Sequence, residues 1–254
     1  MIKKAIVLAA GKGTRLEPLT RAIPKEMIRV GLKPVIEHVI EVLKAGGIEE
    51  ILVIVGRKKE SIMDHLGSGE LLGVSLYYRV QEEPKGTAHA VLQGKGFIGD
   101  DDFVVMYGDN YFKPYGAMRD IQAFHESYEA DATIVLSPVD DPTRFGIAKI
   151  DGEGNVLGMV EKPDLGAAEA FRSGGRFLNI AGLMVLRNEI FGYIDKTKPG
   201  VNGEIWLTDS VELMRLSGRK VMGYVFEGVR FDIGTYESLI EADRLEHSER
   251  TKLE

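Results

Sequence analysis

The chain of 254 residues contains no cysteine. This absence excludes a disulfide framework, a thiolate metal site and a cysteine nucleophile. No run of apolar residues approaches the 18 that a transmembrane helix needs. The apolar run at the N-terminus is too short for a signal peptide and leads directly into a glycine loop. We therefore expect a cytoplasmic protein that has no membrane partner.

Positive charge is in the minority, since 32 Lys and Arg residues face 39 Asp and Glu residues and the net charge is −7. Proteins that bind nucleic acid or anionic membranes generally carry an excess of positive charge, so this balance argues against both. The hydrophobic content of 44% and the charged content of 28% are typical of a globular protein. A chain of this length buries about 70–75% of its unfolded surface, enough for a full hydrophobic core.

Short runs of Val, Ile and Leu alternate with helical patterns in the first half, which indicates βαβ units and an α/β fold. The runs predict strands at Lys4–Ala9, Ile51–Val55, Val74–Val80, Phe103–Tyr107 and Ala132–Leu136. The helical patterns lie at Pro34–Ala45, Lys58–Leu66, Thr87–Gln93 and Gly116–Tyr128. We see no linker and predict one domain over residues 1–254, with a Rossmann-like half at about 1–130.

The second half, about residues 131–247, is mixed and is expected to cap the edge of the sheet. A turn cluster predicts a hairpin there, and further strands and helices follow. The hairpin pairs Gly146–Ile150 with Val156–Val160; strands are predicted at Phe177–Leu186, Val221–Val225 and Val229–Asp232, and helices near Asn188–Ile194, at Asp209–Leu216 and at Tyr236–His247.

Ligands of such sheets bind beyond the carboxyl ends of the strands, so the segments after each strand are the candidates for a site. After the first strand, Gly11 and Gly13 allow backbone N–H groups to close round a phosphate, and Lys12 and Arg15 add positive charge. The spacing is not that of a Walker loop, and Leu16 replaces the third glycine of the dinucleotide fingerprint. A simple glycine turn is the alternative interpretation of this segment.

Three further positions have the chemistry of a phosphate site. Lys25, in the loop Ile23–Met27, is within reach of a polyphosphate held by the glycine loop, and a surface lysine is the alternative. Asp109 lies just after a strand and is flanked by a glycine, and Asp232 ends a strand and comes before a glycine and a helix; both placements suit Mg²⁺ or an Asx turn. Spacing alone does not show that these two carboxylates meet.

Glu161 and Lys162 follow another predicted strand. The glutamate can accept sugar hydroxyls and the lysine can meet a phosphate, although an ion-rich surface turn is the alternative. The five histidines show no metal-ligand spacing, and no Ser-His-Asp arrangement is present.

Together and in this order, these segments indicate a protein family more specifically than any one of them does. The chain resembles the sugar-1-phosphate nucleotidylyltransferases, in particular the glucose-1-phosphate uridylyl- and thymidylyltransferases. The resemblance runs from residue 2 to about residue 245. The matching segments are Leu8-Ala-Ala-Gly-Lys-Gly-Thr-Arg-Leu16 with Pro18, Pro24-Lys-Glu-Met27, Lys33-Pro34, Gln81, Lys85-Gly-Thr-Ala-His-Ala90, Gly108-Asp-Asn110, Phe145-Gly146, Glu161-Lys-Pro163, Gly203-Glu-Ile-Trp-Leu-Thr-Asp209 and Asp232-Ile-Gly-Thr235.

The resemblance implies a three-layer αβα sandwich around a mixed, mostly parallel sheet, with a nucleotide-binding first half and a sugar-phosphate-binding second half. It implies the reaction of a nucleoside triphosphate with a sugar 1-phosphate to give a nucleotide sugar and pyrophosphate, with Mg²⁺ as cofactor. No hexapeptide-repeat domain is expected after the last helix. A homo-oligomer is compatible with the family, although no surface in the sequence identifies an interface.

The resemblance also assigns roles to individual residues. The catalytic residues it implies are Arg15, Lys25, Asp109 and Lys162, and the metal ligands are Asp109 and Asp232. The implied nucleotide-binding residues are Leu8, Ala10, Gly11, Gly13, Thr14, Arg15, Gln81, Gly86 and Thr87. The implied sugar-phosphate-binding residues are Gly146, Glu161, Lys162 and Asn179.

The nucleotide and the sugar stay open. We favour UTP with glucose 1-phosphate and place dTTP close behind, since one methyl group in a pocket discriminates by only about 1–3 kcal/mol. The alternatives are a thymidylyltransferase and an N-acetylhexosamine-1-phosphate uridylyltransferase. Two alternatives come from other classes. A non-catalytic nucleotide-sugar-binding protein conflicts with the presence of four charged residues, Lys25, Asp109, Lys162 and Asp232. A nicotinamide oxidoreductase conflicts with the missing third glycine.

Overall fold

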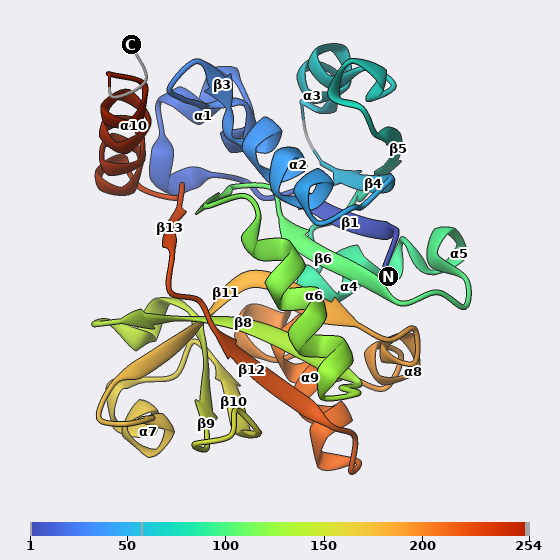
Figure 1. Ribbon diagram of the computed structural model, residues 1–254, viewed down its shortest axis with the longest axis vertical. Helices are drawn as coiled ribbons and strands as arrows, with labels where there is room; N and C mark the ends of the chain where they lie inside the picture. Colours follow the sequence, from blue (N-terminus) through green and yellow to red (C-terminus); the bar gives the residue numbers. More distant parts are fainter. Residues whose placement is uncertain (1, 57, 252–254) are drawn as a thin grey trace.

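Strands and helices alternate along the first half of the chain (Figure 1), and the computed structural model describes residues 2–56 and 58–251. The strands are β1 (Lys4–Ala9), β2 (Arg29–Val30), β3 (Lys33–Pro34), β4 (Glu50–Val55), β5 (Ser75–Val80), β6 (Phe103–Tyr107), β7 (Asn110–Lys113), β8 (Ala132–Val139), β9 (Gly146–Ile150), β10 (Val156–Glu161), β11 (Phe177–Leu186), β12 (Val221–Val225) and β13 (Val229–Asp232). The α-helices are α1 (Leu19–Ala22), α2 (Val35–Ala45), α3 (Lys59–Leu66), α4 (Thr87–Leu92), α5 (Lys95–Ile98), α6 (Ala117–Ser127), α7 (Leu165–Ala168), α8 (Ile190–Ile194), α9 (Leu207–Leu216) and α10 (Tyr236–Thr251). None of these helices is long and apolar enough to cross a membrane.

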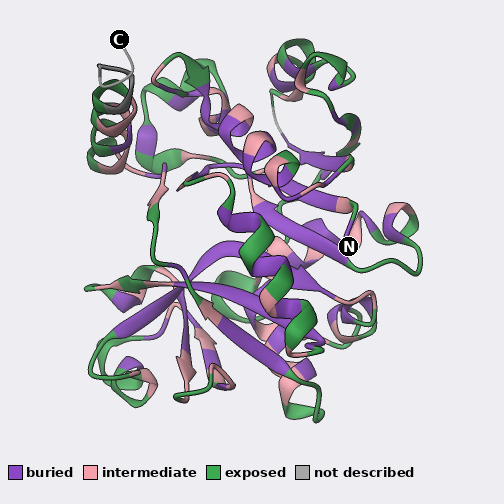
Figure 2. Ribbon diagram, in the orientation of Figure 1, coloured by how far each residue is buried: buried purple, intermediate pink, exposed green. Residues whose placement is uncertain are grey.

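The central strands are apolar on both faces because helices cover both faces. Side chains alternate along a strand, so Ala5 and Val7 of β1 join one core cluster while Ile6 and Leu8 join the other. Helices α2 and α6 complete the first cluster, and α4, α8 and α9 complete the second. Figure 2 shows the resulting layer of buried strands. This is the predicted three-layer αβα sandwich.

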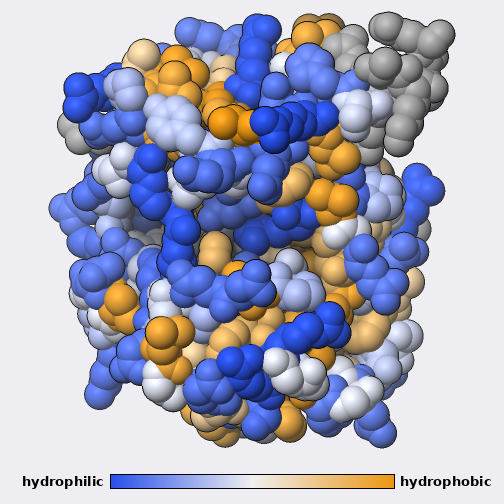
Figure 3. All heavy atoms as spheres, turned by 90° about the vertical axis from the view of Figure 1, so that its left-hand side faces the viewer, coloured by the Kyte–Doolittle hydropathy of each residue, from blue (hydrophilic) through white to orange (hydrophobic). Residues whose placement is uncertain are grey.

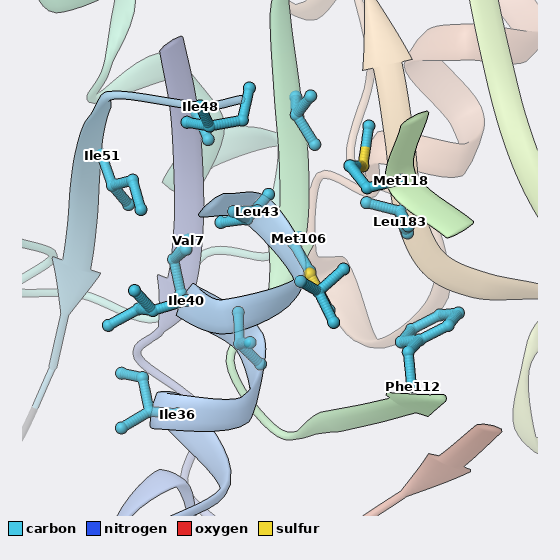
Figure 4. Close-up of a cluster of buried hydrophobic side chains, with 14 of the residues drawn as sticks. Val7, Ile36, Ile40, Leu43, Ile48, Ile51, Met106, Phe112, Met118 and Leu183 are labelled. Carbon is cyan, nitrogen blue, oxygen red and sulfur yellow. The ribbon is translucent and has the colours of Figure 1, made fainter. Parts of the chain in front are cut away.

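Helix α2 shows how sequence spacing produces this packing. Its residues Ile36, Ile40 and Leu43 are three or four positions apart, so they lie on one face of the helix. Figure 4 shows these side chains in one cluster with Val7 and Met106 of the sheet. All five are fully buried, and burial of such a side chain contributes about 1.5–3 kcal/mol to the free energy of unfolding.

Over residues 2–56 and 58–251, nine strands form one sheet in the order β10-β9-β11-β6-β1-β4-β5, with β8 beside β11 and β12 beside β8. Strands β6, β1, β4 and β5 are mutually parallel, and β8, β9 and β12 run in the same direction. Only β11 and β10 run the opposite way. The sheet is therefore mixed and mostly parallel, as predicted.

The second half continues this sheet rather than capping its edge, which corrects the expectation from the sequence. The strand β11 pairs directly with β6 and also with β8 and β9. Its pairing with β8 shifts between Ile180 and Met184, where Gly182 has a φ of +72°. A side chain on Gly182 would have its Cβ 2.6 Å from Asn110 Nδ2, so the bulge requires a glycine.

The predicted strands and helices are all present, many of the strands with the predicted bounds and the other elements with shifted ends. The helix predicted from Asp209 begins at Leu207, and the strand predicted to end at Leu136 continues to Val139 because β11 pairs with it. The sequence analysis missed β7, a short strand that pairs in antiparallel register with β13. This pair matters for the site because it places Asp232 opposite Asn110, the neighbour of Asp109.

Gly228, the residue before β13, tests this pairing. The Cβ of an alanine there would lie 2.2 Å from the Lys113 carbonyl oxygen and 2.3 Å from Phe226 Cζ. We expect Gly228→Ala to lower the free energy of unfolding by about 1–3 kcal/mol, measured by thermal unfolding followed by circular dichroism. The matched control is Gly192→Ala in α8, where the added Cβ meets no atom of the described chain within 4 Å apart from its own helical backbone and its chain neighbours. An unchanged melting temperature for Gly228→Ala would contradict the close approach of β13 to β7.

Candidate active site

A cavity of about 460 Å³ lies beyond the carboxyl ends of β1, β6 and β13. The face turned to the viewer in Figure 3 is hollowed near its middle, and hydrophilic side chains surround the hollow. Fifteen of the sixteen residues that the sequence analysis assigned to a site line the cavity: Leu8, Ala10, Gly11, Gly13, Thr14, Arg15, Lys25, Gln81, Gly86, Thr87, Asp109, Gly146, Glu161, Lys162 and Asp232. The folded chain thus brings together segments up to 224 positions apart, from Leu8 to Asp232.

The glycine loop after β1 is shaped by close packing against Lys25. A Cβ on Gly11 would lie 2.9 Å from Lys25 Cε, so a larger residue there would displace the lysine. Gly13 has a φ of +66°, and its carbonyl oxygen accepts a hydrogen bond of 2.8 Å from Thr20 Oγ1. The loop therefore presents backbone groups, together with Lys12 and Arg15, to the cavity.

An ion pair between Lys25 and Asp109 lies at the floor of the cavity. Burial alone would lower the pKa of Lys25, but the carboxylates of Asp109, Glu26 and Asp232 outweigh it and raise that pKa. The lysine is therefore fully protonated near neutral pH. Its ammonium group is a fixed positive charge at the point where β6 ends.

Asp232 reaches the same place from the other end of the chain. The β13–β7 ladder sets it opposite Asn110, and the backbone N–H of Ile233 donates to the Asp109 carbonyl oxygen at 2.9 Å. Burial, followed by the negative charge of Asp109, raises the pKa of Asp232. Arg15 lies near it, with Nη2 3.8 Å from Asp232 Oδ2.

This pair of carboxylates fits a divalent cation. Oxygen ligands are those that Mg²⁺ prefers, and a dication would relieve the repulsion between the two buried carboxylates. Magnesium commonly binds through one or two protein carboxylates while substrate phosphates and water complete its shell. Within residues 2–56 and 58–251, no group of three or more His, Cys, Asp or Glu side chains forms a metal cage.

On one side of the cavity, Gln81, Gly86 and Thr87 lie at the start of α4. Gly86 has a φ of +102°, and a Cβ there would lie 2.4 Å from the Ile205 carbonyl oxygen. Thr87 Oγ1 accepts a hydrogen bond of 2.9 Å from the N–H of Leu207, which begins α9. These two contacts hold segment 204–207 against the loop that carries Gly86.

Glu161 and Lys162 line another part of the cavity, at the end of β10. Glu161 is buried and accepts a hydrogen bond of 2.7 Å from Thr208 Oγ1, and burial raises its pKa. A Cβ on Gly146 would lie 2.7 Å from Glu161 Oε2, so the glycine leaves room for the carboxylate. Lys162 Nζ lies 3.8 Å from Glu161 Oε1.

Asn179 is the predicted site residue that does not line the cavity. It is almost fully buried, and its amide donates to the Ser137 carbonyl oxygen at 2.7 Å and accepts from Arg230 Nη1 at 3.0 Å. The amide therefore supports Arg230, which does line the cavity and also bonds to Asn110 Oδ1 through Nε at 2.9 Å.

The sequence analysis missed Arg230 as a site residue, although a signal was present. Arg230 and Asp232 are two positions apart in a predicted strand, so they point to the same side. Tyr107, Arg144, Trp206 and Thr208 also line the cavity without having been assigned a role.

The sequence and the fold are similar to those of known proteins. A family model described as nucleotidyl transferase matches residues 4–249. The chain belongs to this family.

Two curated relatives and one solved structure illustrate the similarity. The low-salt glycan biosynthesis nucleotidyltransferase Agl11 of Haloferax volcanii is 39% identical over 95% of this chain, and a glucose-1-phosphate thymidylyltransferase of Streptomyces griseus is 33% identical over 95%. The chain spans 65% of the length of each. A crystal structure of UDP-glucose pyrophosphorylase complexed with UDP-glucose superposes with a TM-score of 0.87 at 29% identity, over 98% of this chain and 100% of that one.

Glu26, the neighbour of Lys25, is a fully buried carboxyl group whose two oxygens have no hydrogen-bond partner among the described residues. Burial raises its pKa to about 7, and the positive charge of Lys25 opposes that rise. Such a group is protonated more readily in the folded chain than in the unfolded one.

Glu26 therefore predicts a pH-dependent stability. Between about pH 4.5 and 7, Glu26 is protonated in the folded chain and ionised in the unfolded chain. The free energy of unfolding therefore falls as the pH rises through this range. We expect Glu26→Gln to be more stable than the natural protein at pH 8, by up to about 3 kcal/mol, and this difference to shrink toward pH 4.5. Denaturant unfolding at several pH values measures it, with Glu60→Gln at an exposed position of α3 as control. A difference that stays constant with pH would contradict the raised pKa.

Proposed function

We propose that this protein transfers a nucleotidyl group from a nucleoside triphosphate to a sugar 1-phosphate and releases pyrophosphate. UTP and glucose 1-phosphate are the favoured substrates, with dTTP close behind. The observation that carries the proposal is that one cavity joins the glycine loop, Lys25, the two aspartates and the Glu161–Lys162 pair. Membership of the nucleotidyl transferase family supports the same reaction class.

The triphosphate is assigned to the glycine loop. Leu8, Ala10, Gly11, Gly13 and Thr14 line that part of the cavity, where backbone N–H groups can approach phosphate oxygens. Arg15 offers a planar guanidinium group, which grips phosphate oxygens in pairs. Gln81, Gly86 and Thr87 are assigned to the base of the nucleotide.

The sugar phosphate is assigned to the other side of the cavity. Lys162 binds its phosphate, and the Glu161 carboxylate accepts hydrogen bonds from sugar hydroxyls beside Gly146. Asn179 acts indirectly, because its amide holds Arg230. Asp109 and Asp232 would hold Mg²⁺, which, when bound, neutralises phosphate charge and polarises the α-phosphate.

The step that follows is an in-line displacement. A phosphate oxygen of the sugar 1-phosphate attacks the α-phosphorus, a new P–O bond forms, and the bond from the α-phosphorus to the bridging oxygen breaks so that pyrophosphate leaves with the electron pair. The attacking phosphate is already anionic near neutral pH, so the reaction needs no general base. Lys25, Arg15 and Lys162 position two polyanions and offset their repulsion.

Pyrophosphate release tests this proposal. The protein is incubated in Mg²⁺ buffer with each of UTP, dTTP, ATP, CTP and GTP, paired with a panel of sugar 1-phosphates that includes glucose, N-acetylglucosamine and mannose. We expect the highest kcat/KM for UTP with glucose 1-phosphate, and a lower value for dTTP. Higher kcat/KM for dTTP or for an N-acetylhexosamine would favour the thymidylyl- or N-acetylhexosamine alternatives. No release from any pair, with nucleotide sugar still bound in calorimetry, would indicate a non-catalytic binding protein.

Asp109 gives the sharpest single-residue prediction. Asp109→Asn keeps the shape of the side chain but removes the charge that pairs with Lys25 and is assigned to Mg²⁺. We expect kcat to fall by about 10²–10³, the usual cost of one electrostatic contact in a site of this kind.

The matched control is Asp195→Asn, which removes an exposed carboxylate that pairs with Lys95 outside the cavity. We expect its kcat to match that of the natural protein. Circular dichroism and the melting temperature verify that Asp109→Asn is folded. A folded Asp109→Asn with full kcat would remove this residue from the catalytic assignment.

A further inference from the structure

Trp206 is the only tryptophan in the chain, and it lines the cavity beside Lys162. It precedes α9, and its indole Nε1 donates a hydrogen bond of 2.9 Å to the Val201 carbonyl oxygen. This bond fixes the orientation of the ring. The short helix that contains Val201 (η6, Val201–Gly203) therefore sets the position of an aromatic face at the mouth of the site.

The ammonium group of Lys162 lies over that face, with Nζ 3.6 Å from the ring centroid. Tryptophan is the aromatic side chain that attracts a cation most strongly. The backbone of Lys162 contributes to the geometry, since its φ is +44° and its N–H donates to the Phe145 carbonyl oxygen at 3.0 Å. The lysine thus leaves β10 in an unusual direction that aims its side chain at the indole.

A second group competes for this lysine. The buried carboxylate of Glu161 is only 3.8 Å from Lys162 Nζ, a loose separation for an ion pair. A compact ammonium group close to a carboxylate in a half-buried site would ordinarily close to hydrogen-bond distance. The indole face draws the ammonium away from Glu161, and it leaves the ammonium group and Glu161 Oε1 available to a ligand, while Oε2 accepts from Thr208.

We propose that Trp206 is a positioning residue: its indole holds Lys162 away from Glu161 in the free enzyme and releases it to the phosphate of the incoming sugar 1-phosphate. This proposal rests on the proposed function for the identity of that ligand. A phosphate dianion attracts an ammonium group more strongly than a neutral ring does, so the exchange is favourable. Lys162 therefore reaches its working position without first breaking a salt bridge.

The single tryptophan makes the contact directly observable. An ammonium group in contact with an indole quenches its emission, and no second tryptophan contributes background. We expect Lys162→Met to emit more strongly than the natural protein in the absence of ligand. We expect glucose 1-phosphate, added with Mg²⁺ and a non-hydrolysable UTP analogue, to raise the emission of the natural protein and to leave that of Lys162→Met unchanged.

The control is Lys196→Met, an exposed lysine near Tyr193 that does not line the cavity. Its emission and its response to glucose 1-phosphate should match those of the natural protein. Equal emission from Lys162→Met and the natural protein overturns the resting contact, whatever the activity. An emission difference that glucose 1-phosphate does not reduce, at concentrations that saturate turnover, overturns the release. The pyrophosphate assay tests the proposed function separately, so the two failures are distinguishable.

Kinetics separate positioning from a merely structural role. In Trp206→Leu the ammonium group can close on Glu161, so sugar phosphate must first break that pair. We expect KM for glucose 1-phosphate to rise about 2- to 30-fold, which corresponds to the loss of one cation–π contact. KM for UTP and kcat at saturation should stay within about twofold of the natural values. Trp206→Phe keeps a ring but loses the hydrogen bond to Val201. Its KM for glucose 1-phosphate should lie between that of the natural protein and that of Trp206→Leu. A fall in kcat with unchanged KM, in a variant with an unaltered melting temperature, would overturn the positioning role.

Discussion

The ion pair of Lys25 and Asp109 is the constraint on which the site depends. A buried pair of charges is tolerated only when its surroundings supply compensating partners, and removal of one partner leaves an uncompensated charge. The surrounding residues meet that requirement, because Gly11 leaves space for the lysine and the β7–β13 ladder adds the carboxylate of Asp232. The glycine loop, strands β7 and β13 and the two candidate metal ligands therefore form one group of residues whose charges depend on one another.

The charge distribution of the molecule follows from this unit. Six cationic side chains line the cavity (Lys12, Arg15, Lys25, Arg144, Lys162 and Arg230), against four acidic ones (Asp109, Glu161, Glu204 and Asp232). The cavity thus has a net charge of +2 in a chain whose total is −7. A local positive field attracts polyanionic ligands, while the acidic remainder of the surface discourages binding to nucleic acid.

Much of the fold and most of the cavity could be predicted because the sequence signals were local. Parallel strands are apolar runs, and their carboxyl ends meet at one edge of the sheet, so the residues that follow them gather in space. The position of Asp232 beside Asp109 was implied by the family resemblance and could not be derived from spacing, because it depends on β7, four residues whose pairing partner lies about 120 positions away. The contact of Lys162 with Trp206 was equally invisible, since it follows from a left-handed backbone residue and a hydrogen bond between loop atoms.

The continuity of β11 has a mechanical consequence. Its ten residues are all buried; its first half pairs with β8 and β9 on the Glu161 side, and its second half pairs with β6, which leads to Asp109. A single strand thus connects the two walls of the cavity, and their separation is set by covalent geometry and ladder hydrogen bonds. The glycine loop and segment 200–206 lie outside this sheet and contribute to the cavity lining, so their conformation can change without altering the spacing that β11 sets.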